Sequence, residues 1–377
     1  MNKNAMYKQV FSLPELIKQQ YEDLEPKIRK VLTTPEIFSI QKIVLVGCGD
    51  SYAAALATKH TFEKLTELPV EIVTALELSR FYPERQLGFA PLNPLVVAVS
   101  NSGEGARVGE AVQRAVKHNA FVLGVTGNPN SLLGRHSSKI VPLQIPSFVS
   151  APGIRSYVVS LITLVLLAIR IAEVRGKITM DRANVLRQDI VSQAEKLELM
   201  LPQIDSQLNL LAKSWDKLEA WDFVGAGSDY ASAWYGHAKI FEATGQYAMH
   251  INSEEWLHLN FFMRNTTKIA TVVFADLKSP GISRTKEMIG YAQLLERPLL
   301  VVSNGESSDF PVPATSHIHY PSTDFEESIS ITQIVPIALL AGYVMVSLGE
   351  VDGRGCEGLW SFCQNGASVK NSEIIVL

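Results

Sequence analysis

The feature that most constrains the fold of this chain is an internal repeat. Residues 43–53 read IVLVGCGDSYA, and a related segment, WDFVGAGSDYA, recurs 178 positions later. A second segment, VLGVTGN at residues 122–128, recurs 177 positions later as LLVVSNG. Two matches at nearly the same offset indicate duplication of a whole domain, because solenoid repeats recur at much shorter periods.

Within the first copy, short apolar runs typical of buried strands alternate with segments of helical periodicity. The runs are residues 43–46, 70–73, 95–99, 121–125 and 140–142, and the clearest helical segments are 52–65 and 106–119. In the second copy we expect strands from Phe223 and at residues 269–274 and 299–302. Such alternation predicts parallel sheets covered on both faces, so we predict an α/β fold of two duplicated, doubly wound, flavodoxin-like domains.

The domain boundaries are placed where this pattern changes. A helical segment, residues 1–36, precedes the first domain at residues 37–176. A long amphipathic stretch, residues 177–218, then leads to the second domain at residues 219–350. The glycine-rich sequence DGRG ends the last helix, so residues 351–377 form a C-terminal tail that we expect to fold over the active site.

Composition argues against several classes of protein. With 34 Lys+Arg against 38 Asp+Glu, the net charge of −4 disfavours a nucleic-acid partner. Three cysteines without a CxxC pair, and an N-terminus without an apolar signal sequence, predict a cytoplasmic protein without a metal site. The longest apolar runs, residues 157–169 and 334–348, fall short of the roughly 20 residues of a membrane span, so we predict buried core helices and no membrane partner.

Two glycine- and serine-rich loops mark the predicted ligand site. Doubly wound sheets bind ligands at the carboxyl ends of their strands, where this chain has GCGDS at residues 47–51 and SNSGEG at residues 100–105. Each loop opens a helix, whose free N–H groups and positive end attract anions, and serine hydroxyls add neutral donors. Together the loops predict a phosphate site. The alternative is that these residues are ordinary turn glycines and N-cap serines, which have the same sequence pattern.

A dinucleotide cofactor does not fit these loops. The third glycine of the G-x-G-x-x-G fingerprint is replaced by Tyr52 in the first copy and by Tyr230 in the second. A tyrosine there obstructs the close approach of a pyrophosphate. The GK[ST] sequence of a P-loop is also missing, so we expect no cofactor.

The duplicated order strand–GCGxS–helix, then strand–SxSGE–helix, resembles the tandem sugar isomerase (SIS) domains of glucosamine-6-phosphate synthases and fructosamine-6-phosphate deglycases. The resemblance covers residues 40–377 and implies a sugar phosphate as substrate. It implies that the phosphate is bound by Ser51, Ser100, Asn101 and Ser102, and that the substrate is also near Gly49, Asp50, Gly103, Ala151 and Arg155. One departure is Gly105, where the synthases usually carry a threonine.

The same resemblance implies the catalytic residues. It assigns Glu242 as the base, His258 as the ring-opening histidine, Lys239 as a supporting lysine and Lys370 in the tail as a lysine that meets the substrate carbonyl. The synthases have a glutamate in place of Tyr235 and a Gly-Pro pair after the histidine. Without the resemblance, these residues also fit a solvated i,i+3 ion pair, a half-buried histidine and a loose surface lysine.

Moving a proton between C1 and C2 of a sugar phosphate needs a carboxylate base, a group that opens the ring and a cation near the enediolate oxygen. We predict a deglycase or deaminase that acts on a 6-phospho amino sugar or fructosamine 6-phosphate. The alternatives are a plain aldose–ketose isomerase and a phosphosugar sensor without catalysis. Glutamine-dependent synthesis is not expected, because it needs an N-terminal cysteine and this chain opens MNK.

The resemblance also implies an assembly. In the synthases the equivalent histidine reaches the site of the neighbouring subunit, so we predict a two-fold homodimer in which His258 completes the partner's site. The apolar residues near it would form the interface core: Leu257, Leu259, Phe261, Phe262 and Met263.

Overall fold

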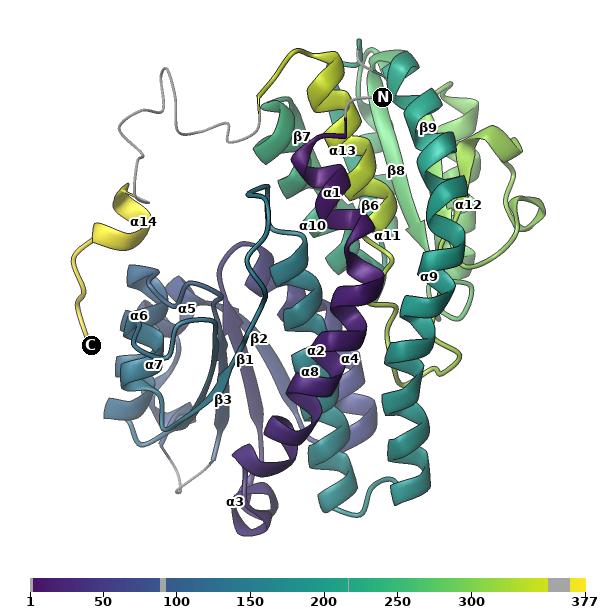
Figure 1. The fold of residues 1–377 in the computed structure, drawn as a ribbon. Coiled ribbons are helices and arrows are strands. Elements are labelled where there is room, and N and C mark those ends of the chain that lie inside the picture. Colours follow the sequence, from purple (N-terminus) through teal and green to yellow (C-terminus); the bar gives the residue numbers. More distant parts are fainter. Residues whose placement is uncertain (1–2, 89–92, 216, 352–366) are drawn as a thin grey trace. The chain divides into compact units, whose positions relative to one another are not determined.

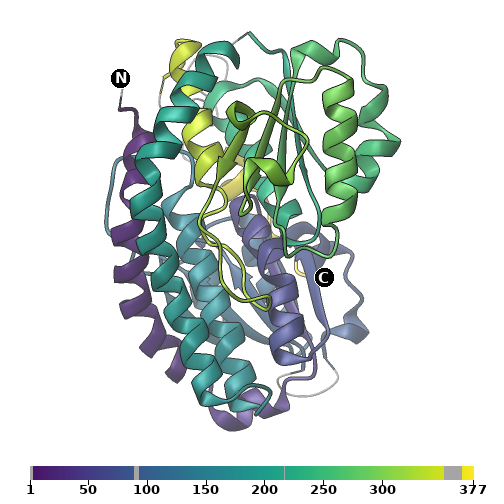
Figure 2. The ribbon, with the colours of Figure 1, turned by 90° about the vertical axis from the view of Figure 1, so that its right-hand side faces the viewer.

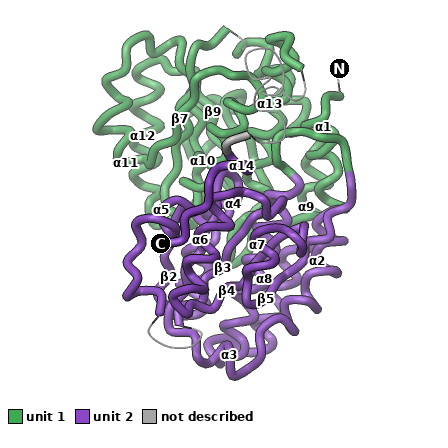
Figure 3. The backbone as a smooth tube through the Cα atoms, turned by 90° about the vertical axis from the view of Figure 1, so that its left-hand side faces the viewer, with its two compact units in different colours: residues 1–15, 148–154, 192–354 green, residues 16–147, 155–191, 355–377 purple. Residues whose placement is uncertain are grey.

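The computed structural model describes residues 3–88, 93–215, 217–351 and 367–377. The chain divides into two compact units, shown in different colours in Figure 3. The first-copy unit comprises residues 16–147, 155–191 and 355–377, and the second-copy unit comprises residues 1–15, 148–154 and 192–354. Each unit is built on one of the two copies of the repeat.

The first-copy unit contains a five-stranded parallel sheet in the order β2-β1-β3-β4-β5. Its strands are β1 (Ile43–Gly47), β2 (Val70–Thr74), β3 (Leu95–Val99), β4 (Phe121–Thr126) and β5 (Lys139–Pro142). One face packs against α5 (Ala75–Arg80), α6 (Ala106–Lys117) and α7 (Leu132–His136), and α4 (Asp50–Thr66) lies on the other with α8 (Arg155–Val174) against it (Figure 1). The central strands β1 and β3 are therefore buried throughout, which explains their continuous apolar sequence.

The second-copy unit repeats this topology, with the sheet order β10-β9-β8-β6-β7 and all neighbours parallel. Its strands are β6 (Ala220–Gly225), β7 (Tyr247–Asn252), β8 (Ile269–Ala275), β9 (Leu299–Ser303) and β10 (His317–His319). Helices α11 (Ser253–His258) and α12 (Ile282–Leu294) cover one face, while α10 (Ser228–Thr244) and α13 (Val335–Ser347) belong to the other (Figures 1 and 2). The predicted duplicated, doubly wound α/β fold is confirmed.

The remaining helices precede, connect or follow the sheets. They are α1 (Ala5–Phe11), α2 (Leu13–Val31), α3 (Thr34–Ser39), α9 (Met180–Trp215) and α14 (Ala367–Asn371). Short 3-10 turns lie at Glu84–Gln86, Asn260–Phe262, Thr266–Lys268, Ser307–Asp309 and Ala314–Ser316. Asn4 caps α1 and donates to the Gly342 carbonyl of α13 at 2.9 Å, so the N-terminal helix belongs to the second-copy unit. The domain boundaries expected from the sequence remain a prediction.

Two strands of the second sheet were not singled out from the sequence. The sequence of β7, YAMHIN, mixes aromatic, polar and apolar residues because the strand lies at an edge of the sheet. The opposite edge strand, β10, has only three residues, which is too short for a periodicity.

Both predicted core helices, α8 and α13, are mostly buried, but α8 is longer than the apolar run from which it was predicted. Helix α8 continues past Arg170 and spans 20 residues, so it is long and apolar enough to cross a membrane by length and composition. Most of its residues are buried, which is equally typical of the core helix of a globular domain.

A buried ion pair supports α11, the helix that carries His258. Arg297 Nη1 lies 3.0 Å from Asp222 Oδ2, and both side chains are buried. The indole N–H of Trp256 in α11 donates to the same oxygen at 3.2 Å. Asp222 therefore neutralises a buried cation and holds α11 on the sheet.

We predict that Asp222→Ala lowers the free energy of unfolding by about 3–5 kcal/mol, because the Arg297 charge is left buried without a partner. Unfolding of the second-copy unit in urea measures this change in the free energy of unfolding. Asp324→Ala, which removes an exposed ion pair with Lys196, is the control and should cost about 1 kcal/mol or less. Equal losses for the two variants would contradict a special role for Asp222.

Candidate functional site

Both serine loops lie at the carboxyl edge of the first sheet, where the strand order reverses. The chain passes from β1 outward to β2 and returns to the other side of β1 as β3. The loops that follow β1 and β3 therefore leave the sheet side by side. This reversal is the usual ligand position in open α/β sheets.

The loop after β1 is a tight turn that depends on two glycines. Gly49 has a φ of 57°, which side chains disfavour, and a Cβ on Gly47 would lie 2.7 Å from the carbonyl carbon of Ser51. The turn allows α4 to begin at Asp50 directly after the loop. Ser51 consequently lies in the first turn of α4, where helix N–H groups and a hydroxyl can act together on an anion.

The loop after β3 is held by its own serines. Ser100 Oγ accepts a hydrogen bond from the N–H of Gly103 at 3.1 Å, and Ser102 Oγ accepts one from the N–H of Glu104 at 3.4 Å. A hydroxyl that accepts one bond keeps its own proton to donate to a ligand. Gly103 has a φ of 66°, and a Cβ there would clash with Ser131. Asn101 and Ser102 are exposed at the start of α6, and their assignment to phosphate remains a prediction.

The corresponding edge of the second sheet carries carboxylates instead. Asp229 matches Ser51 in the repeat, and Asp276 follows β8 as Ser100 follows β3. Buried Asp229 accepts from the N–H of Asp276 at 2.9 Å and from Gln333 Nε2 at 2.6 Å. Burial raises the pKa of Asp229 to about 7, although these two hydrogen bonds lower it. A phosphate at this edge would meet negative charge and an internal network, so we expect one phosphate per chain.

On α10, Lys239 and Glu242 form an ion pair in which the two partners differ in exposure. The side chain of Lys239 is fully buried, its Nζ lies 2.5 Å from Glu242 Oε2, and the Glu242 side chain is 46% exposed. Lys239 Nζ also lies 5.0 Å from the centre of the Tyr235 ring. A buried ammonium needs an anionic partner, so this is not the solvated surface pair that the sequence alone also allowed. The pair holds a carboxylate at the surface in a defined place.

Tyr235, which replaces the glutamate of the synthases, has a structural role. It is buried, and its hydroxyl donates to the carbonyl of Gly153 at 3.1 Å. This contact ties α10 to the segment that contains Ala151. Arg155, only four residues further along, belongs to the first-copy unit, where its Nη2 donates to the Pro146 carbonyl at 3.2 Å.

His258 is the last residue of α11, and its side chain is 66% exposed. Its Nε2 lies 3.3 Å from Glu254 Oε1, and Arg284 Nε lies 2.7 Å from the other oxygen of this carboxylate. The buried residues of α11 are Ser253 and Trp256. His258 is thus an exposed histidine beside an ion pair, not the half-buried one that the sequence alone also allowed.

The predicted site residues fall into two sets. The serine loops and Lys370, an exposed residue of α14, belong to the first-copy unit, whereas Lys239, Glu242 and His258 belong to the second-copy unit. Among the residues described, no group of three or more His, Cys, Asp or Glu side chains could hold a metal ion. Arg107 and Glu110 on α6 form a cluster that contacts the tail and was not predicted; the i,i+3 spacing is its sequence signal.

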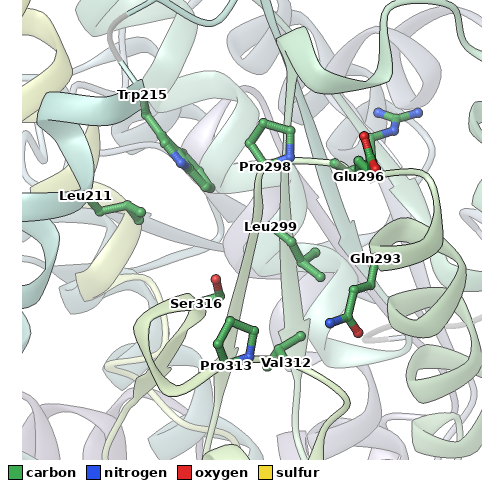
Figure 4. Close-up of a pocket in the computed structure, with 10 residues that line it drawn as sticks. Leu211, Trp215, Gln293, Glu296, Pro298, Leu299, Val312, Pro313 and Ser316 are labelled. Atoms are coloured by element: carbon green, nitrogen blue, oxygen red, sulfur yellow. The ribbon is translucent and has the colours of Figure 1, made fainter.

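A cavity of about 340 Å³ lies at the opposite end of the second sheet, beside the start of β9 (Figure 4). It is lined by Leu211, Trp215, Gln293, Glu296, Arg297, Pro298, Leu299, Val312, Pro313 and Ser316. None of the predicted site residues lines it, and Arg297 is already engaged with Asp222.

We predict that Ser102→Ala weakens binding of glucose 6-phosphate about 10–100-fold, because a hydrogen bond to a charged group contributes about 1.5–3 kcal/mol. Ser100→Asp, which copies the carboxylate of the second sheet, should abolish binding. Calorimetry measures both, with Ser279→Ala in the second-copy loop as a control that binds normally. Equal affinity of the unaltered protein for glucose and glucose 6-phosphate would contradict the phosphate site.

Comparison with known proteins agrees with this geometry. Residues 36–170 match the SIS domain family. An isomerizing glutamine–fructose-6-phosphate aminotransferase of Gloeobacter violaceus is 25% identical over 366 residues, which cover 93% of this chain and 57% of the relative. The chain therefore spans little more than half the length of this relative.

Solved structures show the same fold. The C-terminal domain of a glucosamine-fructose-6-phosphate aminotransferase from Francisella tularensis superposes with a TM-score of 0.81 at 18% identity, covering 93% of this chain and 98% of that one. A glucosamine-6-phosphate deaminase from Thermotoga maritima gives 0.63 at 17% identity, covering 89% and 96%. The match of residues 36–170 to the SIS domain family agrees with the resemblance that the motifs predicted, and the solved structures share the fold of the chain.

Proposed function

We propose that this chain is an enzyme that binds a sugar 6-phosphate at the serine loops and abstracts a proton at C1 or C2 with Glu242. The substrate class is a 6-phospho amino sugar or a fructosamine 6-phosphate, and the overall reaction releases the amine. The observation that carries the proposal is the Lys239–Glu242 pair, in which a buried ammonium holds a half-exposed carboxylate at 2.5 Å. The buried ammonium of Lys239 fixes the position of this carboxylate, and a general base must be held within hydrogen-bond reach of the proton that it abstracts.

The chemistry follows from one proton transfer. Glu242 takes the proton from the carbon of the opened sugar, and the C–H electron pair forms an enolamine between C1 and C2. Return of the proton to the neighbouring carbon leaves an imine, which water hydrolyses to a carbonyl and the free amine. In this scheme His258 moves the proton that opens the ring, and Lys370 stabilises the charge on the substrate oxygen.

The protein is proposed to act as a two-fold homodimer in which His258 completes the partner's site. The 66% exposure of His258 supports this arrangement, because a histidine that serves its own chain's site is normally packed beside it. Next to it Leu259, Phe262 and Met263 are 61%, 75% and 44% exposed, whereas Leu257 and Phe261 pack against the core. Three neighbouring exposed apolar side chains favour burial by a second subunit.

Two other functions use the same site. An aldose–ketose isomerase needs the same proton transfer without a C–N bond to break, and the relative from Gloeobacter violaceus is named as isomerizing. A phosphosugar sensor needs only the serine loops. Incubation in heavy water with glucosamine 6-phosphate, a fructosamine 6-phosphate and fructose 6-phosphate separates the three. Amine release indicates the proposed function, deuterium uptake from fructose 6-phosphate alone indicates an isomerase, and binding without either indicates a sensor.

We predict that Glu242→Gln retains substrate binding and lowers kcat about 10²–10⁴-fold, the usual contribution of a general base. Amine release under saturating substrate measures kcat. Glu287→Gln, which alters an exposed carboxylate of α12, is the matched control and should leave kcat unchanged. Normal turnover by Glu242→Gln would assign the base to another residue.

A mixing experiment tests the shared site. Glu242→Gln and His258→Asn are each expected to be nearly inactive, and after dissociation and reassociation half of the dimers contain one chain of each. In such a dimer one site has both altered residues and the other has neither, so statistical mixing should restore about a quarter of the original activity. Subunit exchange is verified with differently tagged chains. No recovery despite exchange would mean that each chain uses its own histidine.

A further inference from the structure

The last residues of the chain lie along α6. The N–H of Ile375 donates to Glu110 Oε2 at 2.7 Å, and Arg107 Nη2 donates to Ser372 Oγ at 3.2 Å and also to the carbonyl of Glu373. Further along the helix, His118 Nε2 lies 3.4 Å from the carbonyl of Leu377. These contacts join segments about 260 residues apart within the first-copy unit.

Glu110 is the centre of this contact. Its side chain is fully buried, and it lies 2.5 Å from both Arg80 Nε and Arg107 Nη1. Burial acts to raise its pKa, but the hydrogen bonds from Ile375, Arg80 and Ser79 and the charge of Arg107 outweigh this and lower the pKa. The carboxylate is therefore charged at neutral pH, and a buried charge requires every donor that surrounds it, including the N–H of the tail.

The position of α6 gives this contact a consequence for the site. The helix begins at Ala106, directly after the serine loop at residues 100–105. In the tail, Lys370 precedes the anchored Ser372 by only two residues and lies on α14, which packs against α6. The tail therefore contacts the same helix, α6, that begins at the predicted phosphate site.

We propose that Glu110 and Arg107 anchor residues 372–377 on α6 and so act as positioning residues for Lys370. The role of Lys370 rests on the proposed function, whereas the anchor itself does not. The contacts at Glu373 and Ile375 use backbone atoms of the tail, and the contact at Ser372 uses its side chain.

The anchor is tested by hydrogen–deuterium exchange of the C-terminal peptide, followed by mass spectrometry. Arg107→Ala and Glu110→Gln should speed exchange at residues 372–377 about 10–100-fold, as expected for the loss of hydrogen bonds to charged groups. Gln113→Ala, whose side chain bonds only within α6 to Gly109, is the control and should exchange like the unaltered protein. Unchanged exchange in both variants overturns the anchor, whatever the enzyme's reaction.

The positioning role is tested by ending the chain after Asn371, which keeps Lys370. We expect kcat to fall about as far as in Lys370→Ala with KM nearly unchanged, because the serine loops are intact. In the Lys370→Ala background, the same truncation should have no further effect. If the truncated chain turns over normally while Lys370→Ala is slow, the anchor does not position Lys370. Full turnover of Lys370→Ala overturns the role of this lysine in the proposed function, while the exchange result still decides the anchor.

Discussion

The reversal of strand order between β1 and β3 is the constraint on which the rest of the first-copy unit depends. Parallel strands place all their carboxyl ends at one edge, and the reversal leaves two adjacent loops there without a crossing helix between them. Each of these loops leads into a helix, so the positive ends of two helix dipoles lie at this edge. In the proposed function, the serines and glycines at residues 47–51 and 100–105 bind the substrate phosphate at this edge.

Duplication provided a second copy of the same edge, and the two copies have since diverged in charge. In the second sheet Asp229 and Asp276 occupy the positions of serines in the first, and Gln333 donates a hydrogen bond to Asp229. The candidate base lies further along α10 in the Lys239–Glu242 pair. In the proposed function the two copies thus divide the work, with phosphate binding in one and proton transfer in the other.

Helix α6 connects several of these elements within the first-copy unit. Its start follows the serine loop at residues 100–105, its middle carries the buried Glu110, and its end reaches the last residues of the chain. One apolar face packs on the sheet, and the charged residues near its first turn receive the tail. A helix with both roles couples the geometry of the tail to that of the loop.

Much of this protein follows from its sequence by itself. Apolar periodicity and the repeat predict the strands of the first sheet, the central strands of the second and the loops at their ends, because a buried strand requires a local run of apolar residues. The strands β7 and β10 lack such a run, since β7 is a partly buried edge strand and β10 has only three residues. Only the tertiary structure decided that Lys239 is buried, that His258 is exposed and that Glu110 meets the tail. Burial and charge pairing depend on side chains brought together from distant parts of the chain, so a local sequence pattern does not predict them.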